Sequence, residues 1–198
     1  MNGSATPLLI ALYVACELIA NVTAGRTVEV WGFAAPGGVF VYALTFTLID
    51  LLNERMGKSG ARQVVAAAFA ANLLLALYTT LVLTLPTPPF FHEGDAYATV
   101  LGGTPRIVGA SLTAYLLSSL LDVEVFAFWR ERVGGPRWMR VLVSNGISTG
   151  VDSAVFVAIA FYGSLPVIPL IAGQYAIKMA VTVVSLPLIY VTGRSPSP

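Results

Sequence analysis

Six long apolar stretches, separated by short polar connections, dominate the pattern of hydrophobic and polar positions along the chain. Each stretch holds about 18 to 24 residues, close to the ~20 that a helix rising about 1.5 Å per residue needs to cross ~30 Å of hydrocarbon. They lack the alternation of a transmembrane β-strand. The pattern predicts six membrane-spanning helices over residues 7–24, 36–53, 64–85, 106–129, 141–163 and 167–190.

Composition supports this interpretation. Of the 198 residues, 57% are hydrophobic and only 11% are charged, which is too apolar for a water-soluble domain of this length. We therefore expect an all-α integral membrane protein, a six-helix bundle forming one domain over residues 1–198. The short connections leave no room for a soluble catalytic or nucleotide-binding domain and contain no glycine-rich phosphate loop. The net charge of +1 gives no indication of a nucleic-acid partner.

Basic residues predict the topology, because Lys and Arg in short loops stay on the cytoplasmic side. Two connections are basic and one, over residues 86–105, has acids but no Lys or Arg. Both termini are then expected in the cytoplasm. The basic connections carry Arg55, Lys58 and Arg62, and Arg130, Arg132, Arg137 and Arg140; the acidic one carries His92, Glu93 and Asp95.

Polar residues inside the predicted spans recur every three or four positions, which places them on common helix faces. Lipid cannot satisfy such groups, so the polar faces are expected to point inward together. Asn72 is alone in the third span. The polar sets are Glu17 and Asn21; Phe46, Asp50 and Glu54; Ser111, Tyr115, Ser118 or Ser119, and Asp122; Asn145, Ser148 or Thr149, and Asp152; and Gln174, Lys178 and Thr182.

Three charged residues, Glu17, Asp152 and Lys178, lie near the centres of their spans. A lone charge at mid-membrane costs on the order of 3 kcal/mol, so each needs a partner or a polar cavity. Their formal sum of minus one favours one shared proton or one bound cation. The alternative is a structural Lys178 to Asp152 salt bridge with Glu17 protonated. With His92 as the only histidine, no metal site is expected.

An ordered set of short motifs resembles the vitamin uptake transporter family, which includes bacterial queuosine precursor transporters. Together the motifs cover residues 20–190, nearly the whole chain. The sequence departs from the family pattern at Met56, where an aromatic residue is usual, and in having Glu17 before Asn21. The matching residues are Ala20, Asn21, Leu44, Thr45, Phe46, Asp50, Glu54, Gly57, Arg106, Asp122, Val123, Phe126, Trp138, Met139, Arg140, Ser148, Thr149, Asp152, Ser153, Phe156, Gly163, Tyr175, Ala176, Ile177, Lys178, Pro187 and Tyr190.

The resemblance implies uptake, across the cell membrane and by a secondary carrier, of 7-cyano-7-deazaguanine or its 7-aminomethyl relative. Such a base has adjacent N–H donors for one carboxylate, a carbonyl that needs a donor, and planar faces for aromatic stacking. No cofactor or catalytic residue is implied, and the expected partners are the small-molecule substrate, the lipid bilayer and a second copy in a homodimer. The candidates are Glu17 or Asp152 for the donors, Lys178, Gln174 or Asn21 for the carbonyl, and Phe46, Tyr115 or Phe156 for the ring, with Asp50 and Asn145 as further lining residues.

Two other classes compete with a secondary carrier. One is the substrate-binding subunit of an energy-coupling factor transporter, also a small six-helix bundle, whose first helix often carries an Ala-x-x-x-Ala contact like that of Ala11 and Ala15. The other is an intramembrane enzyme. The sequence lacks Gly-x-Gly-Asp, His-Glu-x-x-His and a serine with a histidine inside a span to activate it, so no enzymatic activity is expected.

Overall fold

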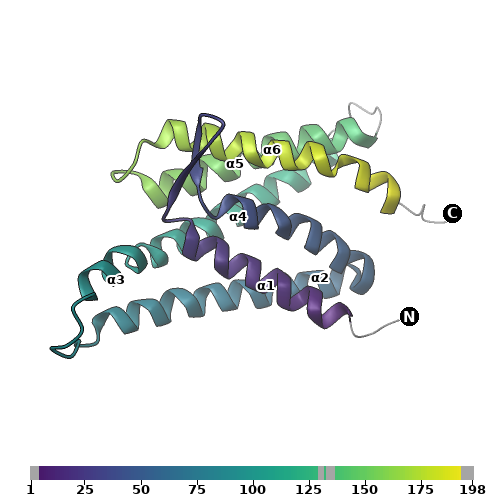
Figure 1. Cartoon of the computed structure of the whole chain (residues 1–198). Helices are drawn as coiled ribbons and strands as arrows, with labels where there is room; N and C mark the ends of the chain where they lie inside the picture. Colours follow the sequence, from purple (N-terminus) through teal and green to yellow (C-terminus); the bar gives the residue numbers. More distant parts are fainter. Residues whose placement is uncertain (1–4, 129–131, 133–136, 193–198) are drawn as a thin grey trace.

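A computed structural model describes residues 5–128, 132 and 137–192, with the side chains of some positions inside these ranges left out. The chain is mostly helical. Figure 1 shows the helices running roughly along one common direction, with α1 beginning and α6 ending at the same end of the bundle. The helices are α1 (Ala5–Thr23), α2 (Val39–Thr84), α3 (Gly94–Leu101), α4 (Thr104–Phe128), α5 (Arg137–Phe161) and α6 (Val167–Thr192).

Length and apolar composition identify membrane-spanning helices. Within the described residues three helical segments are long and apolar enough to cross a membrane, namely Thr6–Thr23, Ser59–Thr84 and Val167–Val184, and Asn145–Phe161 is a shorter apolar helix. These findings confirm a helical protein with hydrophobic spans.

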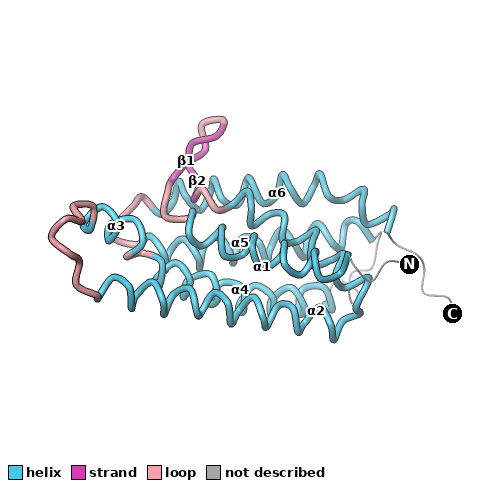
Figure 2. The backbone as a smooth tube through the Cα atoms, turned by 60° about the horizontal axis from the view of Figure 1, so that its bottom comes forward, coloured by secondary structure: helices cyan, strands magenta, loops and turns pink. Residues whose placement is uncertain are grey.

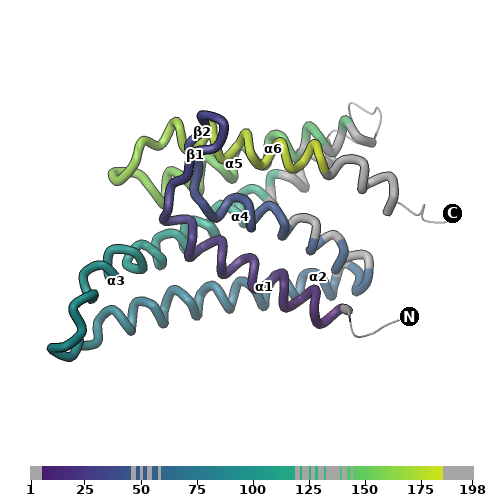
Figure 3. Tube along the Cα trace, viewed as in Figure 1, coloured from purple at the N-terminus to yellow at the C-terminus, as the bar shows by residue number. Residues whose placement is uncertain are grey.

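Helix α2 contains the predicted second and third spans in one element. Its backbone leaves helical geometry at Gly57, where φ is +71° and ψ is 174°. Glycine has no Cβ to oppose a positive φ, so this position can break the helix. Figure 3 shows the two halves of α2 lying antiparallel on either side of this break. The predicted connection around residues 54–63 is therefore a sharp kink.

A β-hairpin between α1 and α2 was not predicted, so the expectation of an all-helical chain is incomplete. Strands β1 (Thr27–Val30) and β2 (Phe33–Pro36) pair antiparallel across Trp31 and Gly32, which both have positive φ, as a tight two-residue turn requires. Figure 2 shows the tip of the hairpin projecting from the bundle beside α6. Trp31 at this tip is 91% exposed. The base of the hairpin is buried.

Two apolar clusters form the core. The first joins α1 to both halves of α2 through Tyr13, Leu52, Val64 and Ala68. The second joins α4, α5 and α6. It is rich in alanine, which lets helices approach closely where no hydrophobic effect drives them together. Its buried members are Ala24, Ile107, Ala110, Ala114, Phe156, Val157, Ala160, Phe161 and Leu170.

Arg106, in the first turn of α4, ties that helix to the end of α5. Its Nε donates to the Ile159 carbonyl at 2.6 Å, and a terminal nitrogen donates to the Tyr162 carbonyl at 2.7 Å. The last carbonyls of a helix lack partners within the helix. A cationic side chain placed there donates hydrogen bonds to them and interacts favourably with the helix dipole. Gly163, with φ of +83°, then ends the α5 segment. Arg106 thus links the start of α4 to the end of α5.

Candidate functional site

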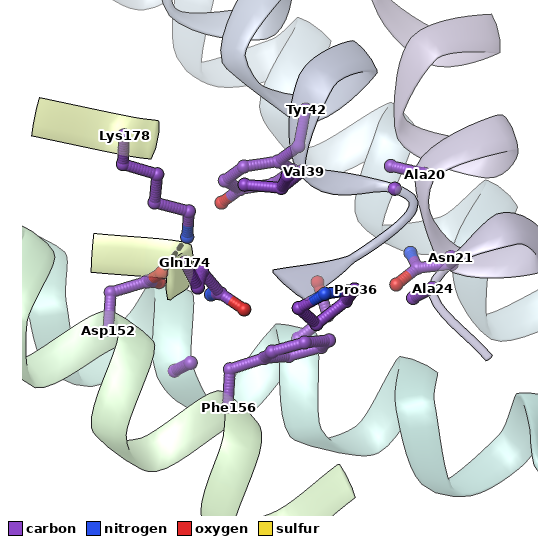
Figure 4. Close-up of a pocket in the computed structure, with 13 residues that line it drawn as sticks. Ala20, Asn21, Ala24, Pro36, Val39, Tyr42, Asp152, Phe156, Gln174 and Lys178 are labelled. Atoms are coloured by element: carbon purple, nitrogen blue, oxygen red, sulfur yellow. Dashed lines mark hydrogen bonds and ion pairs between the residues drawn. The ribbon is translucent and has the colours of Figure 1, made fainter. Parts of the chain in front are cut away.

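A pocket of about 370 Å³, counted out to its mouth, lies where the two halves of the chain meet. Figure 4 shows polar and aromatic side chains from several elements converging on it. Its walls come from α1 and the residue that follows it (Ala20, Asn21 and Ala24), β2 and the start of α2 (Pro36, Gly38, Val39 and Tyr42), α4 (Ser111 and Ala114), α5 (Asp152 and Phe156) and α6 (Gln174 and Lys178).

A buried ion pair between Lys178 and Asp152 forms the charged wall of the pocket. The Lys178 ammonium donates to Asp152 Oδ2, and the two residues are only 5% and 8% exposed. Ser118 Oγ lies 3.4 Å from the other carboxylate oxygen. The ammonium nitrogen also lies 4.6 Å from the centroid of the Tyr42 ring, within reach of a cation–π interaction. Each charge of this pair therefore has a partner, as a buried charge requires.

Glu17 belongs to the same group of charges. It is close enough to interact electrostatically with both Lys178 and Asp152. It does not line the pocket itself. The three central charges thus form one cluster of two acids and one lysine, as the sequence pattern indicated.

Asn21 and Asn72 form a hydrogen-bonded pair between α1 and α2. Asn21 Nδ2 donates to Asn72 Oδ1 at 2.7 Å, and Asn72 Nδ2 donates to the Ala68 carbonyl at 3.0 Å. Asn21 and Asn72 are 3% and 2% exposed, so the hydrogen bonds are made away from solvent. Asn21 lines the pocket and Asn72 does not.

Gln174 brings an unpaired polar group into the pocket. The residue is 3% exposed, and its Oε1 has no hydrogen-bond partner within the described part of the chain. Ser153 Oγ is the other such atom among the described residues, and Ser153 does not line the pocket. Most buried polar atoms in proteins have a partner, so an orphan acceptor at a pocket wall needs an explanation. A bound polar ligand would provide the missing donor.

Aromatic rings and close backbone contacts complete the site. The Phe156 ring is held edge-on against Phe161, with centroids 5.9 Å apart. Gly173 brings α6 against β2, since a Cβ at this position would collide with the carbonyl of Ala34. These contacts fix the base of the hairpin, which supplies Pro36 to the pocket.

The structure gathers half of the predicted site residues around the pocket. Glu17 is adjacent, Tyr115 is 37% exposed with an electrostatic interaction to Glu17, and Asn145 accepts from Ser148 Oγ through its backbone without lining the pocket. The side chains of Phe46 and Asp50 lie outside the described residues. The predicted residues that line the pocket are Asn21, Asp152, Phe156, Gln174 and Lys178.

Sequence reasoning missed Tyr42, Pro36 and Gly38. Tyr42 had a signal, because it continues the four-residue step of Phe46 and Asp50 by one turn. Pro36 and Gly38 reach the pocket through the unpredicted hairpin, and no local pattern marks them.

Comparison with known proteins identifies the family. Residues 36–192 match the family model described as "Putative vitamin uptake transporter". The chain is also 33% identical over 176 residues to a Bacillus subtilis (strain 168) protein named "Probable queuosine precursor transporter", covering 86% of this chain and 77% of that protein. No solved structure matches the chain significantly. The resemblance found in the sequence motifs is confirmed: this membrane protein is a transporter, not an enzyme, and it belongs to the vitamin uptake transporter family.

Proposed function

We propose that this chain carries 7-cyano-7-deazaguanine or 7-aminomethyl-7-deazaguanine into the cell across the cell membrane as a secondary carrier. The observation that carries the proposal is the buried, unpaired Gln174 Oε1 in a pocket beside the Lys178 to Asp152 pair. An apolar guest would leave this acceptor unsatisfied, whereas a polar base brings N–H groups to it. The name of the Bacillus subtilis relative supports the choice of a queuosine precursor.

The pocket chemistry suits a planar, polar base. The base has adjacent N–H donors, and the Asp152 carboxylate can accept from them if the ligand displaces or shares its hydrogen bonds. Lys178 can donate to the base carbonyl from the same wall. Phe156 and Tyr42 are the aromatic side chains available for contact with the ring faces.

The proposed topology has six spans, formed by α1, the two halves of α2, α4, α5 and α6, with both termini in the cytoplasm. Exposed Arg55 and Arg62 flank the kink of α2, at the end of the bundle where α1 begins and α6 ends (Figure 1). The exposed acids Glu93 and Asp95 lie at the opposite end, by α3. This separation of charge supports a cytoplasmic location for the basic end.

An energy-coupling factor subunit is the second candidate. Ala11 is exposed and Ala15 is half-buried on α1, so a face with small residues is open to a neighbouring helix. A second copy of this chain in a homodimer could use the same face. The energy source distinguishes the candidates, because a secondary carrier depends on an ion gradient and the subunit depends on a partner ATPase.

Uptake by a bacterial strain that cannot make either deazaguanine tests the proposal. Expression of this chain should restore accumulation of at least one labelled base, and an ionophore should abolish the uptake while the ATP level is maintained. Uptake that survives the ionophore and requires a copurifying ATPase would replace the carrier with the energy-coupling factor subunit. The absence of uptake of both bases, with the protein present in the membrane, would refute the proposed substrate.

A further inference from the structure

Asn72 lies outside the pocket, yet its hydrogen bonds determine which end of the Asn21 amide faces the ligand. A primary amide has a donor end and an acceptor end of nearly equal shape, so its orientation follows from the hydrogen bonds around it. Here the network ends on the Ala68 carbonyl, a backbone group that can only accept. It therefore sets the direction of every hydrogen bond in the network.

The orientation follows in two steps. Asn72 must present its nitrogen to the Ala68 carbonyl, because its own oxygen there would bring two buried acceptors together. Its Oδ1 then faces Asn21, which must donate a hydrogen bond to it from Nδ2. Reversing both amides would leave the Ala68 contact without a hydrogen, a costly arrangement at 2–3% exposure.

The Asn21 oxygen consequently remains for the pocket. Figure 4 shows the oxygen end of this amide turned toward Pro36 and the nitrogen end turned away. No donor among the described residues reaches this oxygen. The pocket thus has an acceptor on α1 that a ligand can reach, held in place by a residue that does not line the pocket.

We infer that Asn21 Oδ1 accepts a hydrogen bond from an N–H group of the transported base, and that Asn72 is the positioning residue that makes Asn21 an acceptor. This inference rests on the proposed function and deepens it. The sequence had suggested Asn21 as one of several donors to the base carbonyl, and the network favours the opposite role. Substrate selection at this wall then depends on a donor at one edge of the base.

We expect a base that lacks this N–H donor to bind more weakly than the parent base. A buried acceptor left without a partner weakens binding by roughly 5- to 150-fold. The probes are 7-cyano-7-deazaguanine and three analogues, one without the 2-amino group, one methylated at N1 and one methylated at N9. The measured quantity is the ratio of each analogue's Kd to that of the parent base. This ratio does not depend on the amount of folded protein.

Wild-type protein should bind at least one analogue tenfold or more weakly than the parent base. In Asn21→Ala and in Asn72→Leu that ratio should fall at least fivefold, since the first variant removes the acceptor and the second frees the amide to turn its nitrogen inward. Asn72→Ala replaces the leucine variant if that protein does not accumulate. Thr79→Val is the matched control, because it removes a hydroxyl from the same helix about two turns away and should keep the wild-type ratio.

The outcomes separate this inference from the proposed function. If wild-type protein binds neither deazaguanine, the proposed function fails and this inference fails with it. If the protein binds the parent base but tolerates all three analogues, or if the Asn21 and Asn72 variants keep the wild-type ratios, the inference alone is overturned.

Discussion

Neutralising one partner of the Lys178 to Asp152 pair should damage both stability and binding, whereas neutralising both should damage binding alone. Asp152→Asn removes the carboxylate to which the Lys178 ammonium donates and leaves a lysine that is only 5% exposed. Breaking a buried pair in this way costs about 3–5 kcal/mol, and Glu17, which remains in the cluster, keeps the loss at the low end of that range. A net loss near 3 kcal/mol corresponds to a fall in Tm of roughly 6–12 °C for a chain of this size.

The double variant Asp152→Asn with Lys178→Met separates the two roles. It contains no buried charge at the pair, so its stability should lie within about 1 kcal/mol of wild type. Its affinity for 7-cyano-7-deazaguanine should remain more than 100-fold reduced, because both charged ligand contacts are gone. Asp95→Asn, which removes an exposed acid from α3, is the control for a simple change in net charge.

The assay combines thermal unfolding of the purified protein in detergent with equilibrium binding of the labelled base. The expected pattern is a low Tm in both single variants, a recovered Tm in the double variant, and no binding in any of the three. Near wild-type affinity in the stable double variant would show that the pair only ties α5 to α6, and would remove both residues from the site.

Three further predictions test the scaffold and the pocket wall. Arg106→Ala should lower the Tm by several degrees, because the end of α5 loses two charge-assisted hydrogen bonds; an unchanged Tm would contradict its role as a cap. Gly173→Val should abolish binding by pushing β2 off α6, whereas Gly109→Ala, with open space around its Cβ, should bind normally; equal binding by both would refute the packing argument. Gln174→Leu should raise the Tm and weaken binding at least tenfold, since it removes an unsatisfied oxygen that the ligand needs; a variant that loses stability but keeps affinity would show that Gln174 supports the fold instead.

The helical spans and the central charge cluster could be predicted from the sequence because both follow from the cost of polar groups in hydrocarbon. Glu17, Asp152 and Lys178 lie near the centres of the predicted spans, where a lone charge is costly, and the structure brings them together. The four-residue step of Gln174 and Lys178 likewise predicted the face of α6 that lines the pocket.

The hairpin could not be predicted in the same way. Each strand has only four residues, only the first of them alternates polar and apolar side chains, and a two-stranded ribbon is marginal without support. The hairpin is supported by α6, because Gly173 contacts Ala34. These two residues are about 140 positions apart in the sequence. The pairing of Asn72 with Asn21 also depends on how two helices rotate against each other, and spacing within one helix does not determine that rotation.

The most direct test of the account is an experimental structure of the protein bound to 7-cyano-7-deazaguanine. We expect the base to lie in the pocket between the two halves of the chain. Its N–H groups should be within hydrogen-bond distance of Asn21 Oδ1 and Gln174 Oε1, and Lys178 or Asp152 should lie at its edge. A base bound elsewhere, with this pocket empty, would contradict the account.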